Sequence, residues 1–136
     1  MKILGVDYGD KRTGIAVSDI NEFLASGLYD IHPTGLHDAA AKIVKAAEEN
    51  NAQKIVMGLP LNMNGTRGDR AEKTELIKQY ISEISDIPVE LFDERVTTMQ
   101  AQTIMNMTGT RGKKRKDRVD ILSAEIILQN YLDKNH

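Results

Sequence analysis

Residues 2–8 (KILGVDY) constrain the fold most, because Ile3, Leu4 and Val6 put apolar groups on both faces of a strand. A strand buries both faces only when it lies inside a sheet that is covered on both sides. The segment therefore predicts a central strand, and this strand ends at Asp7. In open α/β sheets, ligands bind beyond the carboxyl ends of the strands. Asp7 thus occupies a position where a functional side chain is expected.

The rest of the chain alternates between short apolar strands and helices with one apolar stripe. Strands are predicted over 2–8, 13–18, 25–31, 54–58 and 89–92, and helices over 37–50, 70–84, 97–107 and 117–132. The short connections among the first three strands favour antiparallel pairing, whereas the alternating part favours parallel strands with right-handed crossovers. We expect an α/β fold with a mixed five-stranded sheet, its first three strands antiparallel, and helices on both faces. A length of 136 residues suits one domain, 1–136.

Composition excludes several classes of site. The chain has no cysteine, which rules out disulfides, a Cys-ligated zinc and a thiol nucleophile. It has no apolar run of transmembrane length and no apolar leader, so a cytoplasmic location is expected. The net charge of −2 does not favour a nucleic-acid partner, but six of the eight residues in Arg111–Arg118 are Lys or Arg. A local basic cluster on a mildly acidic chain is a selective signal for such a partner.

Acidic residues follow two predicted strands and begin the last predicted helix. Asp93 and Glu94 come directly after the strand at 89–92, and Asp7 lies at the end of the first strand. Asp120 shares the apolar stripe of its helix, where an acid needs a compensating partner. That stripe is formed by Ala124, Ile127 and Tyr131, and the opposite, polar face is formed by Glu125, Gln129 and Asp133. Each acid also has a structural interpretation: a turn aspartate for Asp7, loop carboxylates for Asp93 and Glu94, and an N-terminal helix position for Asp120.

Carboxylates that are distant in sequence and meet at one end of a sheet form an oxygen-rich site that suits Mg²⁺ or Mn²⁺. Two such ions can activate a water and stabilise the leaving oxygen in phosphodiester cleavage. Other chemistry has little support. His32, His37 and His136 lack metal-ligand spacing, and the glycines of 58–68 match neither a P-loop nor a dinucleotide fingerprint.

Four ordered motifs, VDYGDKRTGIAVSD (6–19), GLPLNMNGT (58–66), FDERVTT (92–98) and VDILSAEIILQNYLD (119–133), make the chain resemble the YqgF family. This family is also called RuvX and is described as a Holliday junction resolvase or as a nuclease that matures the 5′ end of pre-16S ribosomal RNA. The resemblance covers essentially the whole chain. It implies an RNase H-like fold and a metal-dependent nuclease.

Carried over by motif, the resemblance implies that the catalytic and metal-binding acids are Asp7, Glu94 and Asp120. Related resolvases carry the second acid on the fourth strand, which here ends in Gly58-Leu59-Pro60 without a carboxylate. An acid on the fifth strand must therefore reach across its neighbour. Asp93 and Glu94 point to opposite faces if the strand stays regular, so only one of them can serve easily, and we favour Glu94. Two smaller departures are Asn64 and Ser123, where the family commonly has aspartate and alanine.

Basic residues near these acids are candidates for phosphate contacts. Lys11 and Arg12 match a basic pair of the family, and Lys116 matches its basic position before the helix acid. The predicted nucleic-acid-binding residues are Lys11, Arg12, Arg67, Arg95, Arg111, Lys113, Lys114, Arg115 and Lys116. The alternative for the basic run is a solvated loop that contacts nothing specific. Tyr8 is the one aromatic residue beside a predicted catalytic acid, so base stacking has little support.

Three functions remain as hypotheses. The first is an endonuclease that uses Mg²⁺ or Mn²⁺, in pre-16S rRNA maturation or as a resolvase of branched DNA. The second is a non-catalytic nucleic-acid-binding or ribosome-associated module. The third is a nucleotide-handling relative, which the size of one domain disfavours because ATP must be enclosed by a second lobe. Resolvases of four-way junctions act as symmetric dimers, so a homodimer is a further expectation, although no apolar patch marks an interface.

Overall fold

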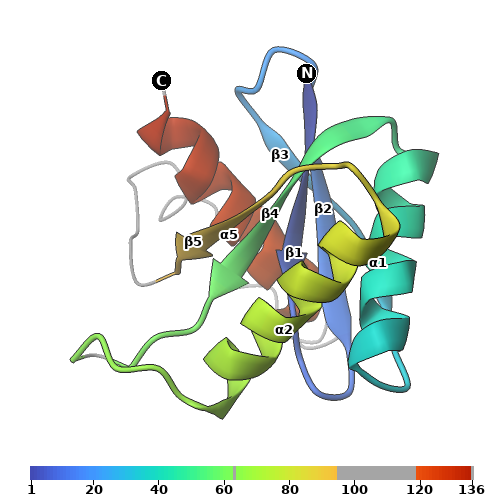
Figure 1. The fold of residues 1–136 in the computed structure, drawn as a ribbon. Helices are drawn as coiled ribbons and strands as arrows, with labels where there is room; N and C mark the ends of the chain where they lie inside the picture. The colour runs from blue at the N-terminus through green and yellow to red at the C-terminus, as the bar shows by residue number, and fades with distance from the viewer. Residues whose placement is uncertain (63, 95–118, 136) are drawn as a thin grey trace.

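The computed structural model describes residues 1–62, 64–94 and 119–135 (Figure 1). The strands are β1 (Lys2–Asp7), β2 (Thr13–Ser18), β3 (Ala25–Ile31), β4 (Ala52–Leu59) and β5 (Val89–Asp93), and the helices are α1 (Leu36–Glu49), α2 (Asp69–Ile84) and α5 (Val119–Lys134). These elements confirm eight of the nine predicted segments, with ends that differ by two residues or fewer. The predicted helix at 97–107 lies outside the described residues.

The sheet has five strands in the order β3-β2-β1-β4-β5, so the strand with two apolar faces lies at its centre. β1 pairs antiparallel with β2, and β2 pairs antiparallel with β3. On its other side β1 pairs parallel with β4, which pairs parallel with β5. The predicted α/β fold class, with a mixed sheet whose first three strands are antiparallel, is therefore confirmed.

Helices cover both faces of the sheet (Figure 1): α1 and α2 lie on one face, and α5 lies on the other. Along β1 the side chains alternate between two apolar clusters. Leu4 and Val6 belong to the cluster with α1 and α2, whereas Ile3 belongs to the cluster with α5. Alternation therefore directs Asp7, two residues after Gly5 and four after Ile3, toward the α5 face.

Helix α5 lies very close to β1 because position 5 has no side chain. A Cβ at Gly5 would lie 2.7 Å from the Cβ of Leu128, which is closer than real side chains allow. The close approach lets Leu128 become fully buried. A glycine inside a strand commonly marks such an approach of another element.

The polar residues of α5 bind the outer edge of the sheet. β3 is an edge strand, and an edge strand leaves every second N–H without a strand partner. The N–H of Ala25 donates to Oε1 of Gln129 at 2.9 Å, and the N–H of Gly27 donates to Oε1 of Glu125 at 2.8 Å. Gln129 is fully buried. The face that the sequence indicates as polar thus accepts hydrogen bonds from two N–H groups of β3.

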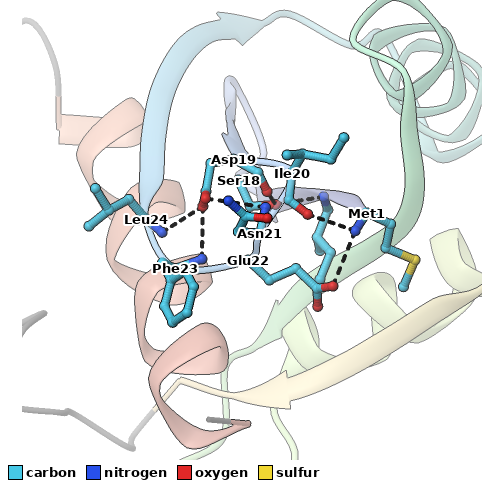
Figure 2. A network of polar contacts seen from close by, with 9 residues as sticks. Met1, Ser18, Asp19, Ile20, Asn21, Glu22, Phe23 and Leu24 are labelled. Atoms are coloured by element: carbon cyan, nitrogen blue, oxygen red, sulfur yellow. Dashed lines mark hydrogen bonds and ion pairs between the residues drawn. The ribbon is translucent and has the colours of Figure 1, made fainter.

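The turn between β2 and β3 is organised by one carboxylate (Figure 2). Asp19 accepts hydrogen bonds from the backbone N–H groups of Phe23 and Leu24, each at 2.8 Å, and of Asn21 at 3.2 Å. These backbone donors, that of Leu24 foremost, lower the pKa of Asp19 below its usual value. Glu22 takes a positive φ of 62° inside this turn.

This turn lies at the end of the sheet opposite to Asp7, next to the start of β1. The N–H of Ile3 donates to the hydroxyl of Ser18 at 2.8 Å, which ties the two strands together there. The turn exposes large apolar side chains, namely Ile20, Phe23 and Leu24. Among the described helices, none is long and apolar enough to cross a membrane.

Candidate active site

Asp7 and Glu94 lie in one cleft, at the carboxyl ends of β1 and β5. The cleft has a volume of about 330 Å³ and lies between the end of the sheet and α5. Its described lining residues are Asp7, Arg70, Glu94, Ser123, Ile126, Ile127 and Asn130. The structure therefore brings together two of the three predicted acids. The side chain of the third, Asp120, lies outside the described residues.

Gly58 explains how an acid beyond the fifth strand comes close to one on the first. β4 lies between β1 and β5, and Gly58 pairs with Phe92 in the register of β4 and β5. A Cβ at position 58 would lie 2.6 Å from Oε2 of Glu94 and 2.5 Å from Cδ1 of Ile127. Any side chain at position 58 would occupy the space that Glu94 uses. The end of β4 carries no carboxylate, and the missing side chain at Gly58 leaves the space that the Glu94 side chain occupies.

Asp93 and Glu94 take different positions. Phe92 packs with the apolar cluster under α5, whereas Leu91 packs with the cluster under α1 and α2. Continuing that alternation directs Asp93 away from α5 and returns Glu94 toward it. Among the described residues that line the cleft, Glu94 is present and Asp93 is not.

The Glu94 carboxyl group is held in an unfavourable environment for its charged form. Its Oε2 is buried and has no hydrogen-bond partner among the residues that the structure describes. Burial raises the pKa of Glu94 above its usual value, and the negative charge of Asp93 raises it further, while Arg70 lowers it. A carboxylate oxygen without a partner in a cleft is typical of a group that binds something else.

Among the described residues that line the cleft, Arg70 is the one cation, and it is not among the residues predicted from the sequence. It lies in the first turn of α2, and its Nη2 is 3.6 Å from Oδ1 of Asp7. The same guanidinium donates a hydrogen bond to the backbone carbonyl of Tyr8. The dipole of a helix disfavours a cation in its first turn. A basic residue at that position, directly after the loop that follows β4, is the signal that could have indicated its role.

Helix α5 supplies the opposite wall of the cleft. Ser123, Ile127 and Asn130 are spaced by four and three residues, so they share one face of the helix. Asn130 is almost completely buried, although it is polar. Position 120 lies one turn before Ser123 in the same helix. Ile127, which belongs to the apolar stripe that Asp120 was expected to share, is one of the residues that line the cleft.

The predicted basic residues fall into three groups. Lys11 and Arg12 are exposed in the turn between β1 and β2, at the same end of the sheet as Asp7. Arg67 forms an ion pair with Glu75 of α2. The rest of the predicted nucleic-acid-binding residues lie outside the described residues: Arg95, Arg111, Lys113, Lys114, Arg115 and Lys116.

Tyr8 does not offer a stacking surface. Its side chain is buried in the apolar cluster with α1 and α2, on the other side of the sheet from Glu94. Its hydroxyl donates to Oδ1 of Asp10 at 3.4 Å, and Asp10 also pairs with Lys73. This position agrees with the expectation that base stacking has little part in the site.

No three His, Cys, Asp or Glu side chains form a metal-binding group among the residues that the structure describes. The cleft contains two carboxylates, an amide and a hydroxyl, all of which are oxygen donors, in the side chains of Asp7, Glu94, Asn130 and Ser123. Oxygen donors of this kind suit hard divalent cations rather than zinc or copper.

A model of the RuvX family, described as Holliday junction resolvase, matches residues 1–134. The chain belongs to the RuvX family. Two relatives are each named "Putative pre-16S rRNA nuclease". The one from Ruminiclostridium cellulolyticum is 42% identical over 98% of this chain and 95% of its own length. The one from Oceanobacillus iheyensis is 40% identical over 98% of this chain and 99% of its own length.

Solved structures resemble the RuvX chain in fold. The RuvC protein of T. thermophilus, in complex with a Holliday junction substrate, has a TM-score of 0.63 with 13% identity, over 99% of this chain and 95% of that one. The Fowlpox virus resolvase, in complex with Holliday junction DNA, has a TM-score of 0.60 with 13% identity, over 99% of both chains. The predicted RNase H-like fold, the YqgF (RuvX) resemblance and the assignment to the nucleases are confirmed.

Proposed function

We propose that this chain is an endonuclease that uses Mg²⁺ or Mn²⁺ to hydrolyse phosphodiester bonds in the maturation of the 5′ end of pre-16S rRNA. The names of its relatives support the RNA substrate. The observation that supports the chemistry most is the buried Oε2 of Glu94, which has no hydrogen-bond partner in the described part of the chain and lies in the cleft that Asp7 also lines. A cation bound between these groups would give that oxygen the partner that it needs.

The residues of the cleft fit a divalent cation. Asp7 and Glu94 are the carboxylates that would hold it, and Gly58 leaves the space that brings Glu94 near. Asp120 is the third proposed ligand, because the helical period of 3.6 residues puts position 120 on the face that lines the cleft. When bound, a cation of this kind lowers the pKa of water and stabilises charge on a phosphoryl oxygen. A pair of cations would suit three carboxylates, as in other nucleases with two-metal sites.

The substrate would approach the cleft over basic side chains. Lys11 and Arg12 stand beside Asp7 at the sheet end, where they can contact phosphates on one side of the scissile bond. The segment Arg111–Lys116 and Arg95 are proposed to contact further phosphates. Arg67 would have to exchange its ion pair with Glu75 for a phosphate. Pre-ribosomal particles are the partners that an rRNA substrate entails.

Cleavage of a pre-16S 5′-precursor fragment, with Mg²⁺ or with excess chelator, tests this proposal. We expect cleavage that requires the metal and falls at least about 100-fold in Asp7→Asn, because even outer-sphere partners of a metal cost 10- to 100-fold. Asp19→Asn is the matched control, since it changes an equally placed strand-end acid at the opposite end of the sheet. Equal cleavage by the unchanged protein and by Asp7→Asn would refute the proposal.

A second candidate is resolution of four-way DNA junctions, which the family description and the fold of the two resolvases favour. The same proteins assayed on a mobile four-way junction test it. Paired symmetric cuts need two active sites, so this candidate also predicts a homodimer, which sedimentation at assay concentrations would detect. Cleavage of the junction at a rate above that of the rRNA fragment would favour this candidate over the first.

A further inference from the structure

Arg70 and Asp7 form an ion pair whose two partners differ in how firmly they are held. The Asp7 side chain retains only 17% of its exposure at the end of a central strand, whereas the Arg70 side chain retains 44% at the start of a helix. Asp7 is therefore the more buried partner, and Arg70 is the partner that lies nearer to solvent. The separation of 3.6 Å between Nη2 and Oδ1 gives attraction between charges without a short hydrogen bond.

The guanidinium has a second contact that keeps it beside the cleft. Arg70 donates a hydrogen bond to the carbonyl of Tyr8, the residue after Asp7. Its positive charge also lowers the pKa of Glu94 against the effect of burial. One side chain thus acts on Asp7 and on Glu94, the two acids among the described residues that line the cleft.

Lys73, a second cation of α2, forms ion pairs with different acids. Lys73 lies one turn further along α2 and pairs with Asp10 at 3.1 Å and with Asp69 at 3.3 Å. Neither of these acids lines the cleft. Arg70 therefore pairs with an acid of the cleft, whereas Lys73 pairs with acids outside it.

A divalent cation and Arg70 have to share the charge of Asp7. The two cations repel one another, and the low-dielectric surroundings of a partly buried carboxylate strengthen that repulsion. Resting on the proposed function, we infer that Arg70 is the internal counter-cation of the acidic cleft and competes with the divalent metal for Asp7. Metal binding then requires Arg70 to give up its pairing with Asp7. The cleft is charge-compensated at low metal concentration and takes up the metal only as the concentration rises.

Arg70 thus has a role in the proposed metal site, although it is not one of the three acids. Arg70 sets the metal concentration at which the site is filled. Removing it should therefore tighten metal binding, which is the opposite of what a residue that merely holds Asp7 in place would do. That opposite sign is the basis of the test.

Mn²⁺ binding to the full chain, measured by isothermal titration calorimetry without nucleic acid, tests the inference. Arg70→Met removes the charge while keeping an unbranched side chain, and we expect its Mn²⁺ dissociation constant to be roughly five- to tenfold lower than that of the unchanged protein. Lys73→Met should stay within about twofold, since Lys73 does not pair with Asp7. Asp7→Asn should bind at least about tenfold more weakly than the unchanged protein.

Arg70→Lys provides a second test that does not depend on the behaviour of the Met variant. It keeps a positive charge at the start of α2, so its Mn²⁺ affinity should stay closer to that of the unchanged protein than to that of Arg70→Met. The rise of the melting temperature with added Mn²⁺ is an independent readout. This rise should be larger for Arg70→Met, because tighter binding to the folded state stabilises it more.

The outcomes separate the inference from the proposed function. Unchanged or weaker Mn²⁺ binding in Arg70→Met, with binding still lost in Asp7→Asn, would overturn the competition and leave the metal-dependent nuclease intact. Equal tightening in Arg70→Lys and Arg70→Met would overturn it too, because charge would not be the cause. Absence of Mn²⁺ binding in every variant and in the unchanged protein would overturn both.

Discussion

The two ends of the sheet hold their carboxylates in opposite ways. Asp19, at the end where β1 begins, accepts three backbone N–H groups, and these lower its pKa. Glu94, at the end where β1 finishes, has a buried oxygen without a hydrogen-bond partner among the described residues, and burial raises its pKa. Asp19 stabilises the turn that it organises, whereas the environment of Glu94 opposes its charge. Glu94 is therefore the better candidate for binding a ligand, because its surroundings in the protein disfavour its negative charge.

The largest expected effect concerns catalysis at the two ends. Glu94→Gln should reduce metal-dependent cleavage at least about 100-fold, since it removes a proposed metal ligand. Asp19→Asn should leave the rate within about twofold, because a surface change remote from the site rarely acts on it. Single-turnover cleavage of one labelled rRNA fragment compares the two variants directly. Similar rates for both would end the functional distinction between the two ends.

The second expected effect separates the space beside Glu94 from its charge. Gly58→Ala should lower the free energy of unfolding by about 1–3 kcal/mol, the usual cost of overpacking. Its Cβ would lie 2.5 Å from Ile127 Cδ1 and 2.6 Å from Glu94 Oε2. Gly5→Ala is the matched control, because its Cβ also meets α5, at Leu128, but meets no acid. Urea unfolding and cleavage below the melting range should show that both variants lose stability and only Gly58→Ala loses activity.

A third expected effect is a gain of stability. In chelator at pH 8, Glu94→Gln should raise the free energy of unfolding by about 1 kcal/mol, the size expected for relieving a buried, unpaired charged oxygen. The pKa of Glu94 is raised in the folded state above its ordinary value of 4.5. The stability from its protonation is therefore fully present below pH 4.5 and is lost as pH rises through the raised pKa. Unfolding at several pH values should show the advantage of the variant shrinking toward acid, and a constant advantage would argue against this cause.

The smallest expected effect is a pH dependence of the opposite sign. The pKa of Asp19 is lowered from its ordinary value of 3.8, so its contribution to stability is present above pH 3.8 and is lost as pH falls through the lowered pKa. Asp19→Asn should be slightly less stable than the unchanged protein at neutral pH, with the difference vanishing in strong acid. Thermal melting across that range measures it. A variant that gained stability at neutral pH would contradict the role of Asp19 in the turn.

The sequence predicted the parts of the fold that depend on local pattern. The short apolar segments at 13–18 and 25–31 were predicted as strands with the ends that the structure has. Apolar groups on both faces, namely Ile3, Leu4 and Val6, correctly predicted β1 as the central strand. Asp7 and Glu94 were predicted as neighbours from strand ends and motifs, and the cleft contains both.

The features that were not predicted from the sequence depend on contacts between segments that are far apart in the chain. Arg70 meets Asp7 only because the start of α2 lies beside the end of β1, and no spacing within either element indicates this. The periodicity of α5 indicated a polar face at Glu125 and Gln129, but could not show that this face meets unpaired N–H groups of β3. Gly58 was noted for lacking a carboxylate, whereas its importance lies in lacking any side chain.

The hydrogen bonds between α5 and the edge strand β3 have a consequence for synthesis of the chain. The hydrogen bonds from Ala25 to Gln129 and from Gly27 to Glu125 join residues 104 and 98 positions apart. While the nascent polypeptide emerges from its ribosome, β3 therefore remains an unprotected edge until translation has reached α5. Contacts of such long range form late and slowly, and an unpaired edge invites pairing with other chains. The helix that lines the candidate active-site cleft is thus also the segment that protects this edge once it has been synthesised.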